Sequence, residues 1–129
     1  MKVIASSFAD PADVRAFERA KASGMSDEEA FRYGDNGIGC WGDNTAQEHT
    51  PMCALPPDDM EAKWGSVAAA KHRRVLVSLG DEPVECILAD RMPWKRNIKN
   101  GAGIDLNPAA VKALGIRKGA MVQVTWQWK

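Results

Sequence analysis

Two aspartates, Asp90 and Asp105, are the residues of this chain best placed to do chemistry. Asp90 closes an apolar run over residues 84–89 that is typical of a strand, and Asp105 comes two residues before a predicted helix start. Side chains at the ends of elements are often displayed for binding or catalysis. A neighbouring carboxylate can also raise the pKa of a carboxyl group, which then keeps a proton to donate near neutral pH.

The loop between these aspartates carries side chains suited to a sugar ligand. The face of Trp94 can stack on the C–H surface of a sugar ring, and amide and cationic groups can bond hydroxyl or carboxylate groups. The candidate ligand-binding residues are Trp94, Arg91, Asn97 and Lys95. The alternatives are a solvated loop without a ligand and a loop that contacts a phosphate backbone.

Local patterns predict the elements that hold these residues. A short helix over residues 107–114 is indicated by Asn107 as N-cap, Pro108 in the first turn and Gly115 after the end. Strands are expected over residues 38–41, 73–79, 83–89 and 120–128, and apolar and polar side chains alternate along the last of them. Gly80-Asp81-Glu82 has the composition of a hairpin turn.

A helical hairpin is predicted over residues 10–34. Asp10 and Pro11 can start its first helix, and the capping box Ser26-Asp27-Glu28-Glu29 can start a second, shorter helix that ends at Gly34. The second helix is acidic, whereas a DNA-reading helix needs basic residues for phosphates. We therefore expect a structural attachment.

Several short motifs follow one another within residues 75–126. They are Asp90-Arg91-Met92-Pro93, Ile104-Asp105-Leu106-Asn107-Pro108, Ala113-Leu114-Gly115-Ile116 and the run from Gly119 to Val124. Together they resemble the double-psi β-barrel of the rare lipoprotein A family, a barrel shared with expansins and barwin-like endoglucanases. Cys40-Trp41-Gly42 and the segment from Met52 to Pro56 echo two further family segments.

The resemblance implies a mainly β fold. We expect a six-stranded double-psi β-barrel over residues 37–129, with residues 1–36 as an N-terminal helical hairpin packed on it as part of one compact unit. Val14, Phe17 and Phe31 are the apolar side chains expected to face the barrel.

The resemblance also assigns roles in a polysaccharide groove. Asp105 would be the proton donor, Asp90 the neighbour that raises its pKa, and Trp41 a second stacking residue. A lytic transglycosylase needs only one acid, because the sugar's own hydroxyl captures the cation. The family's upstream His has no counterpart here, Cys40 stands where the family has a hydroxyl residue, and Met92 replaces a glycine. These departures favour binding over cleavage.

Three cysteines allow at most one disulfide. Within the implied barrel, Cys53 falls on an early strand and Cys86 on the strand leading to Asp90, which makes them the candidate pair. Three buried, reduced thiols are the alternative. No metal or cofactor is expected, because the spacing of His49 and the cysteines fits no structural zinc site and residues 34–45 lack the ligand pattern of a calcium loop.

Composition limits the classes of partner. The 129 residues fit one domain, and 17 basic residues balance 17 acidic ones. Residues 1–64 carry 12 acidic and 6 basic residues, and residues 65–129 carry 5 and 11, so the two halves attract each other. No apolar run is long enough to span a membrane, and no signal peptide is visible. The resemblance implies the cell envelope, or a phage or secretion route; compartment and oligomeric state stay open.

The sequence thus predicts a protein that binds cell-wall-type polysaccharide, with peptidoglycan glycan strands as the favoured ligand. If it is an enzyme, we expect a lytic transglycosylase or a glycoside hydrolase. One alternative is a non-catalytic expansin-like or protein-interaction module. A minor alternative is a swapped-hairpin DNA-binding regulator, which residues 113–124 also resemble, although zero net charge argues against a nucleic acid partner.

Overall fold

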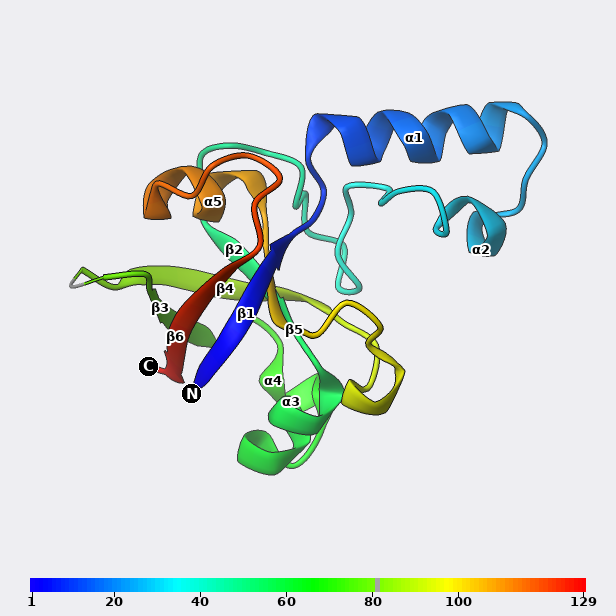
Figure 1. Ribbon diagram of the computed structural model, residues 1–129. Helices are drawn as coiled ribbons and strands as arrows, with labels where there is room; N and C mark the ends of the chain where they lie inside the picture. Colours follow the sequence, from blue (N-terminus) through cyan, green and yellow to red (C-terminus); the bar gives the residue numbers. More distant parts are fainter. Residues whose placement is uncertain (81) are drawn as a thin grey trace.

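The computed structural model describes residues 1–80 and 82–129, and its centre is a closed barrel of six strands (Figure 1). The strands are β1 (Lys2–Ser7), β2 (Met52–Leu55), β3 (Arg74–Ser78), β4 (Val84–Arg91), β5 (Ala102–Leu106) and β6 (Val122–Trp128). The helices are α1 (Pro11–Ala22), α2 (Asp27–Ala30), α3 (Pro57–Trp64), α4 (Val67–Ala70), α5 (Pro108–Leu114) and the 3-10 turn η1 (Lys95–Asn97).

The strand order around the barrel is β1-β5-β2-β4-β3-β6, and β6 pairs with β1 to close it. The pairs β1–β5 and β2–β4 are parallel, and the other pairs are antiparallel. Parallel neighbours need crossover connections, so the chain passes over the barrel between them. Closure leaves no free sheet edge. This mixed, closed architecture confirms the predicted six-stranded double-psi fold class.

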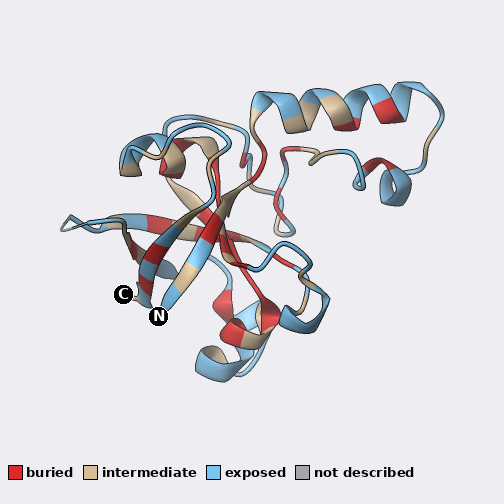
Figure 2. Cartoon of the chain, viewed as in Figure 1, coloured by how far each residue is buried: buried red, intermediate tan, exposed pale blue. Residues whose placement is uncertain are grey.

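Apolar side chains from the strands fill the barrel. The largest fully buried ones include Leu55, Leu88, Ile104 and Leu106. Figure 2 shows burial concentrated along the strands, with little of it on the projecting helices. On β6, Val124 and Trp126 are buried, whereas Gln123, Thr125 and Gln127 are exposed, which confirms the predicted alternation.

Helix α5 begins and ends as predicted. The Asn107 side chain accepts a hydrogen bond from the Ala110 amide (2.9 Å), and Gly115 ends the helix in the left-handed region at φ 69°. The same side chain accepts from the Met52 amide (2.8 Å) and donates to the carbonyls of Thr45 and Thr50 (both 3.1 Å). Asn107 therefore fixes the segment leading into β2 as well as the helix.

The structure corrects the predicted division of the chain. Residues 2–7, grouped in the sequence with the helical hairpin, form barrel strand β1 between β5 and β6. Their pattern hid this role, because Ile4 is apolar yet exposed, so the alternation is weak. The strand predicted over residues 38–41 is also absent: Ile38 makes only an isolated bridge to Asn44 within a glycine-rich turn. The turn predicted at 80–82 includes Asp81, which lies outside the described residues.

Helices α1 and α2 form an arm that projects from the barrel (Figure 1). Phe17 packs against Phe31 with ring centroids 4.8 Å apart, and with Ala20 and Ala30 it forms a cluster separate from the barrel core. Phe31 is 47% exposed. The expected packing of Phe17 and Phe31 against the barrel is therefore not found, because the two rings bury their apolar surface against each other.

The arm is followed by a segment that approaches the barrel backbone closely. A Cβ atom at Gly39 would lie 2.0 Å from the Ala89 carbonyl oxygen, so only glycine fits there. Val14 of α1 lies against this segment near Gly37. In the part of the chain that the structure describes, no helix has both the length and the apolar character of a membrane span.

Candidate functional site

The structure brings Asp90 and Asp105 to neighbouring positions on the barrel wall. Both pair in register with Ala54, which lies on β2 between them. Two strand spacings separate their Cα atoms by about 10 Å. Asp105 occupies the face of β5 opposite Ile104 and Leu106, which are buried in the core. The two carboxylates therefore lie outside the barrel interior, above a small residue that leaves space between them.

Ser6 supplies the direct partner of Asp105. It pairs in register with Asp105 across the parallel strands β1 and β5, and its hydroxyl donates a hydrogen bond to Asp105 Oδ1. The sequence placed Cys40 where the family has a hydroxyl residue. In the structure a hydroxyl reaches the site from β1 instead, while Cys40 lies beside Asp90.

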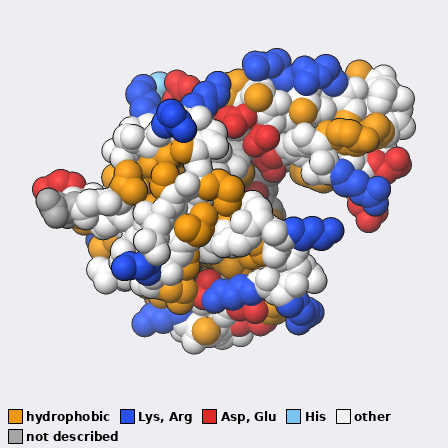
Figure 3. Space-filling view, in the orientation of Figure 1, with side chains coloured by type: hydrophobic (Ala, Val, Ile, Leu, Met, Phe, Trp, Pro, Cys, Tyr) orange, Lys and Arg blue, Asp and Glu red, His pale blue; other side chains and the backbone are white. Residues whose placement is uncertain are grey.

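The surroundings of Asp105 favour its protonated form. The pKa of Asp105 is raised to about 6. Burial is the largest cause of this rise, the hydrogen bond from Ser6 opposes it, and the charges of Asp90, Asp13 and Asp35 add to it. Burial also raises the pKa of Asp90, Asp35 and Asp13. Figure 3 shows acidic side chains gathered where the arm meets the barrel.

Asp90 is held more firmly than Asp105. Its Oδ1 accepts hydrogen bonds from the backbone amides of Arg91 (2.8 Å) and Cys40 (3.0 Å). Burial raises its pKa, but these two amides and the charge of Arg91 lower it. Asp90 thus anchors the turn at Gly39 and Cys40 on the end of β4 and stays a source of negative charge for Asp105.

A cleft of about 540 Å³ opens beside Asp105, between the arm and the loop that follows β4. We call it the Asp105 cleft. Its lining combines Phe31 and Arg32 of the arm, Met92, Pro93, Asn97, Ile98, Lys99 and Asn100 of the loop, and Asp105 itself. The cleft therefore offers one aromatic ring, amide groups, cationic groups and a carboxyl group to a ligand.

Of the predicted ligand-binding residues, only Asn97 lines this cleft. Trp94 is half-buried beside it, with the Arg96 guanidinium 5.4 Å from its ring centroid. Arg91 lies exposed at the end of β4. Lys95 points to α3 instead, where its Nζ lies 2.9 Å from Asp59 Oδ1.

Trp41 is also elsewhere. It packs against the barrel core, and its ring meets His72 edge-on, with centroids 6.1 Å apart. The structure thus does not unite Trp41 and Trp94 into one stacking platform.

The three cysteines are free in the structure. Cys53 and Cys86 are buried, so the predicted disulfide between them is not formed and they pack as small apolar side chains. Cys40 is exposed, yet partial burial of its thiol, the charge of Asp90 and a hydrogen bond to Asp90 raise its pKa to about 11. Across residues 1–80 and 82–129, no three His, Cys, Asp or Glu side chains are arranged to hold a metal ion.

Sequence reasoning missed four contributors to the site: Ser6, Asp13, Asp35 and the pair Phe31–Arg32. The signal that could have found Ser6 is the alternation of a strand over residues 2–7, but this alternation is weak because the exposed residue Ile4 is apolar. The other residues belong to the arm or to the segment after it, and only the tertiary arrangement brings them near Asp105. No local signal marks them.

No protein-family model matches this chain, and no curated protein sequence matches it. Among solved structures it is similar to a Streptomyces papain inhibitor, with 18% sequence identity and a TM-score of 0.55. The similarity covers 99% of this chain and 92% of the inhibitor chain. At this identity the similarity shows the fold alone, and it includes the arm as well as the barrel.

Proposed function

We propose that this protein binds a cell-wall-type polysaccharide, with peptidoglycan glycan strands as the favoured ligand, in the Asp105 cleft. The observation that carries the proposal is a half-buried carboxyl group, with a pKa raised to about 6, beside a cleft of about 540 Å³. Pockets of this size hold small organic ligands or a few sugar rings. The motifs of residues 75–126 that resemble the rare lipoprotein A family support the same ligand class.

The chemistry of the cleft suits a glycan. Amide side chains such as Asn97 and Asn100 both donate and accept hydrogen bonds, as sugar hydroxyls do. The exposed ring of Phe31 offers an apolar surface for sugar C–H groups. Lys99 and Arg32 can pair with the carboxylate groups that peptidoglycan carries.

Asp105 is the residue for a cleavage step. With a pKa of about 6, the Asp105 carboxyl group is protonated in about a tenth of the protein molecules at pH 7. In these molecules it can protonate the glycosidic oxygen as the C–O bond breaks. In a lytic transglycosylase the sugar's own hydroxyl then attacks the cation, and its proton returns to the Asp105 carboxylate. Asp90 acts from a distance, because its charge adds to the effect of burial in raising the pKa of Asp105.

Binding and cleavage are tested separately with purified, insoluble peptidoglycan. We expect the wild-type protein to sediment with the polymer and Lys99→Ala or Asn97→Ala to weaken this binding, whereas Lys71→Ala, at an exposed position outside both this cleft and the other pockets, leaves it unchanged. If soluble fragments are released, Asp105→Asn should abolish release while preserving sedimentation. Asp90→Asn should leave residual release and shift the alkaline limb of the pH profile, which Asp105 sets, to lower pH.

Sedimentation without release supports the non-catalytic, expansin-like alternative. A wild-type protein that sediments with no glycan contradicts the proposal.

A second candidate is inhibition of a papain-like cysteine protease, as the name of the similar Streptomyces protein states for that protein. The observation that favours it is an exposed apolar segment after α2, where Phe31, Tyr33 and Ile38 are 47%, 62% and 54% exposed. Where such side chains form a contiguous apolar patch, they mark a protein-binding surface. A papain activity assay tests it: inhibition that Tyr33→Ala removes and Met121→Ala, at an exposed site elsewhere, retains would support this candidate.

A further inference from the structure

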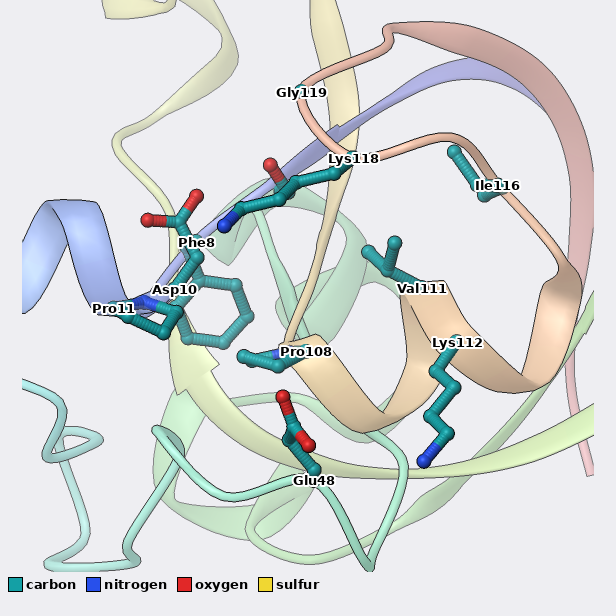
Figure 4. A pocket seen from close by; sticks show the side chains of 11 residues that line it. Phe8, Asp10, Pro11, Glu48, Pro108, Val111, Lys112, Ile116, Lys118 and Gly119 are labelled. Carbon is teal, nitrogen blue, oxygen red and sulfur yellow. The ribbon is translucent and has the colours of Figure 1, made fainter.

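A second pocket is linked to the Asp105 cleft through one buried apolar cluster. Phe8 lines this pocket, and Phe8 packs in the same apolar cluster as Met92, which lines the cleft. The second pocket has a volume of about 390 Å³ and lies between the start of α1, helix α5 and the turn before β6 (Figure 4). We call it the α5 pocket.

The floor of the α5 pocket is apolar. Phe8, Pro108, Val111 and Ile116 line it, and the first two lie at its centre in Figure 4. These side chains offer one aromatic ring and several methyl and methylene groups, with no amide or hydroxyl side chain among them. Such a floor favours small aliphatic groups over the hydroxyl-rich faces of a sugar.

The rim of the α5 pocket carries charges of both signs. Asp10 and Lys118 lie toward one end of the view in Figure 4, and Glu48 and Lys112 toward the other. In the described part of the chain, none of these four side chains takes part in a salt bridge. Asp10 does cap α1 by accepting a hydrogen bond from the Asp13 amide. A purely anionic or purely cationic ligand would meet repulsion at each end of such a rim, whereas a ligand with both charges would be matched.

We propose that the α5 pocket binds the peptide stem of the peptidoglycan strand whose glycan occupies the Asp105 cleft; this inference rests on the proposed function. A stem peptide carries carboxylates, a free side-chain ammonium group and alanine methyl groups within a few residues. Its carboxylates match Lys118 and Lys112, its ammonium group matches Glu48 or Asp10, and its methyl groups match the floor at Phe8 and Pro108. The Asp105 cleft would then bind the glycan of the polymer, and the α5 pocket would bind its peptide.

The test uses the full chain and the free pentapeptide L-Ala-γ-D-Glu-L-Lys-D-Ala-D-Ala, titrated into isotopically labelled protein while backbone amide signals are followed. We expect saturable shifts centred on residues 108–119 and on Glu48. Acetylation of the peptide's lysine should weaken binding about twofold to fivefold, and so should Glu48→Gln or Lys118→Gln. Combining Glu48→Gln with the acetylated peptide should add little to either change alone.

Lys71→Gln, at an exposed position outside both pockets, is the matched control and should leave peptide affinity unchanged. The absence of saturable shifts, or equal affinity for the acetylated peptide, would overturn the inference. A parallel titration with glycan strands stripped of peptide separates the two proposals. If stripped glycan binds and the pentapeptide does not, the α5 pocket inference fails and the proposed function stands; if only the pentapeptide binds, the proposed function fails and the pocket remains a peptide site.

Discussion

Asn107 and Asp105 lie two residues apart in the chain, at the junction of β5 and α5, and their side chains are in opposite situations. The Asn107 amide is fully buried, and four backbone groups, two donors and two acceptors, are bonded to it. Asp105 has a single hydroxyl partner, Ser6, and three other carboxylates near it. The first arrangement stabilises the fold, and the second lowers stability at neutral pH. A poorly matched polar group beside a well-matched one is typical of a functional site.

The largest effect is expected when Asn107, the residue with all its hydrogen bonds made, is replaced. Asn107→Ala should lower the free energy of unfolding by about 3–5 kcal/mol, because it leaves buried amides and carbonyls of three segments without partners. Urea unfolding measures this change. The matched control, Asn97→Ala at an exposed position, should stay within about 0.5 kcal/mol of wild type. A loss below about 1 kcal/mol for Asn107→Ala would show that water replaces these bonds.

Replacing Asp105 should change the free energy of unfolding in the opposite direction. Because folding raises the pKa of Asp105 from 3.8 to about 6, this group favours the folded state fully below about pH 4, and that contribution is lost as the pH rises through about 6. Asp105→Asn should therefore raise stability by about 1–2 kcal/mol at pH 7, after allowance for its partial exposure, and by almost nothing at pH 4.

Urea unfolding at the two pH values checks this, with Glu28→Gln at an exposed site of α2 as control. Equal destabilisation by Asp105→Asn at both pH values would identify Asp105 as a structural brace and would count against the proposed cleavage step.

The partner of Asp105 gives a smaller effect. Ser6→Ala removes the hydrogen bond that lowers the pKa of Asp105, so the carboxyl group should titrate above about pH 6. Carbon-13 NMR of the aspartate carboxyl groups measures the titration directly. Ser7→Ala, whose side chain lines the α5 pocket instead, should leave the titration of Asp105 unchanged. A downward shift in Ser6→Ala would mean that the hydroxyl stabilises the protonated form.

The smallest expected effect concerns the thiol beside Asp90. With its pKa raised to about 11, exposed Cys40 should react with iodoacetamide at pH 8 far more slowly than a free cysteine, although it is the accessible thiol of the three. Asp90→Asn should speed this reaction about twofold to fivefold, since it removes the charge that opposes the thiolate. Glu28→Gln should leave the rate unchanged. A thiol titration of the denatured, unreduced protein should find three free thiols per chain. A count of one would mean that the Cys53–Cys86 disulfide predicted from the sequence does form.

Elements with strong local signals could be predicted from the sequence. Asn107, Pro108 and Gly115 specify α5, and the alternation from Val122 to Trp128 specifies β6, because in both cases the signal lies within a few residues. That Asp90 and Asp105 lie near each other was predicted from their places at strand ends and from the family resemblance.

Features that depend on distant contacts could not be predicted. β1 was missed because its outward residue Ile4 is apolar, and with it the hydroxyl of Ser6. Lys95 and Trp41 were assigned to the ligand because nothing in the local sequence shows that Asp59 and His72 take them as partners. Two acidic neighbours of Asp105 were also missed: Asp13 lies in the arm and Asp35 in the segment after it, and no periodic pattern encodes their placement.

The position of β1 also bears on how the chain reaches its fold. β1 pairs on both sides with strands that come much later in the sequence, β5 and β6. Pairings between residues so distant in sequence slow folding, because loop-closure entropy must be overcome before any contact compensates it. During translation, β1 is therefore made well before either of its partners. Barrel closure has to wait for β5 and β6, and until then β1 presents unpaired strand edges.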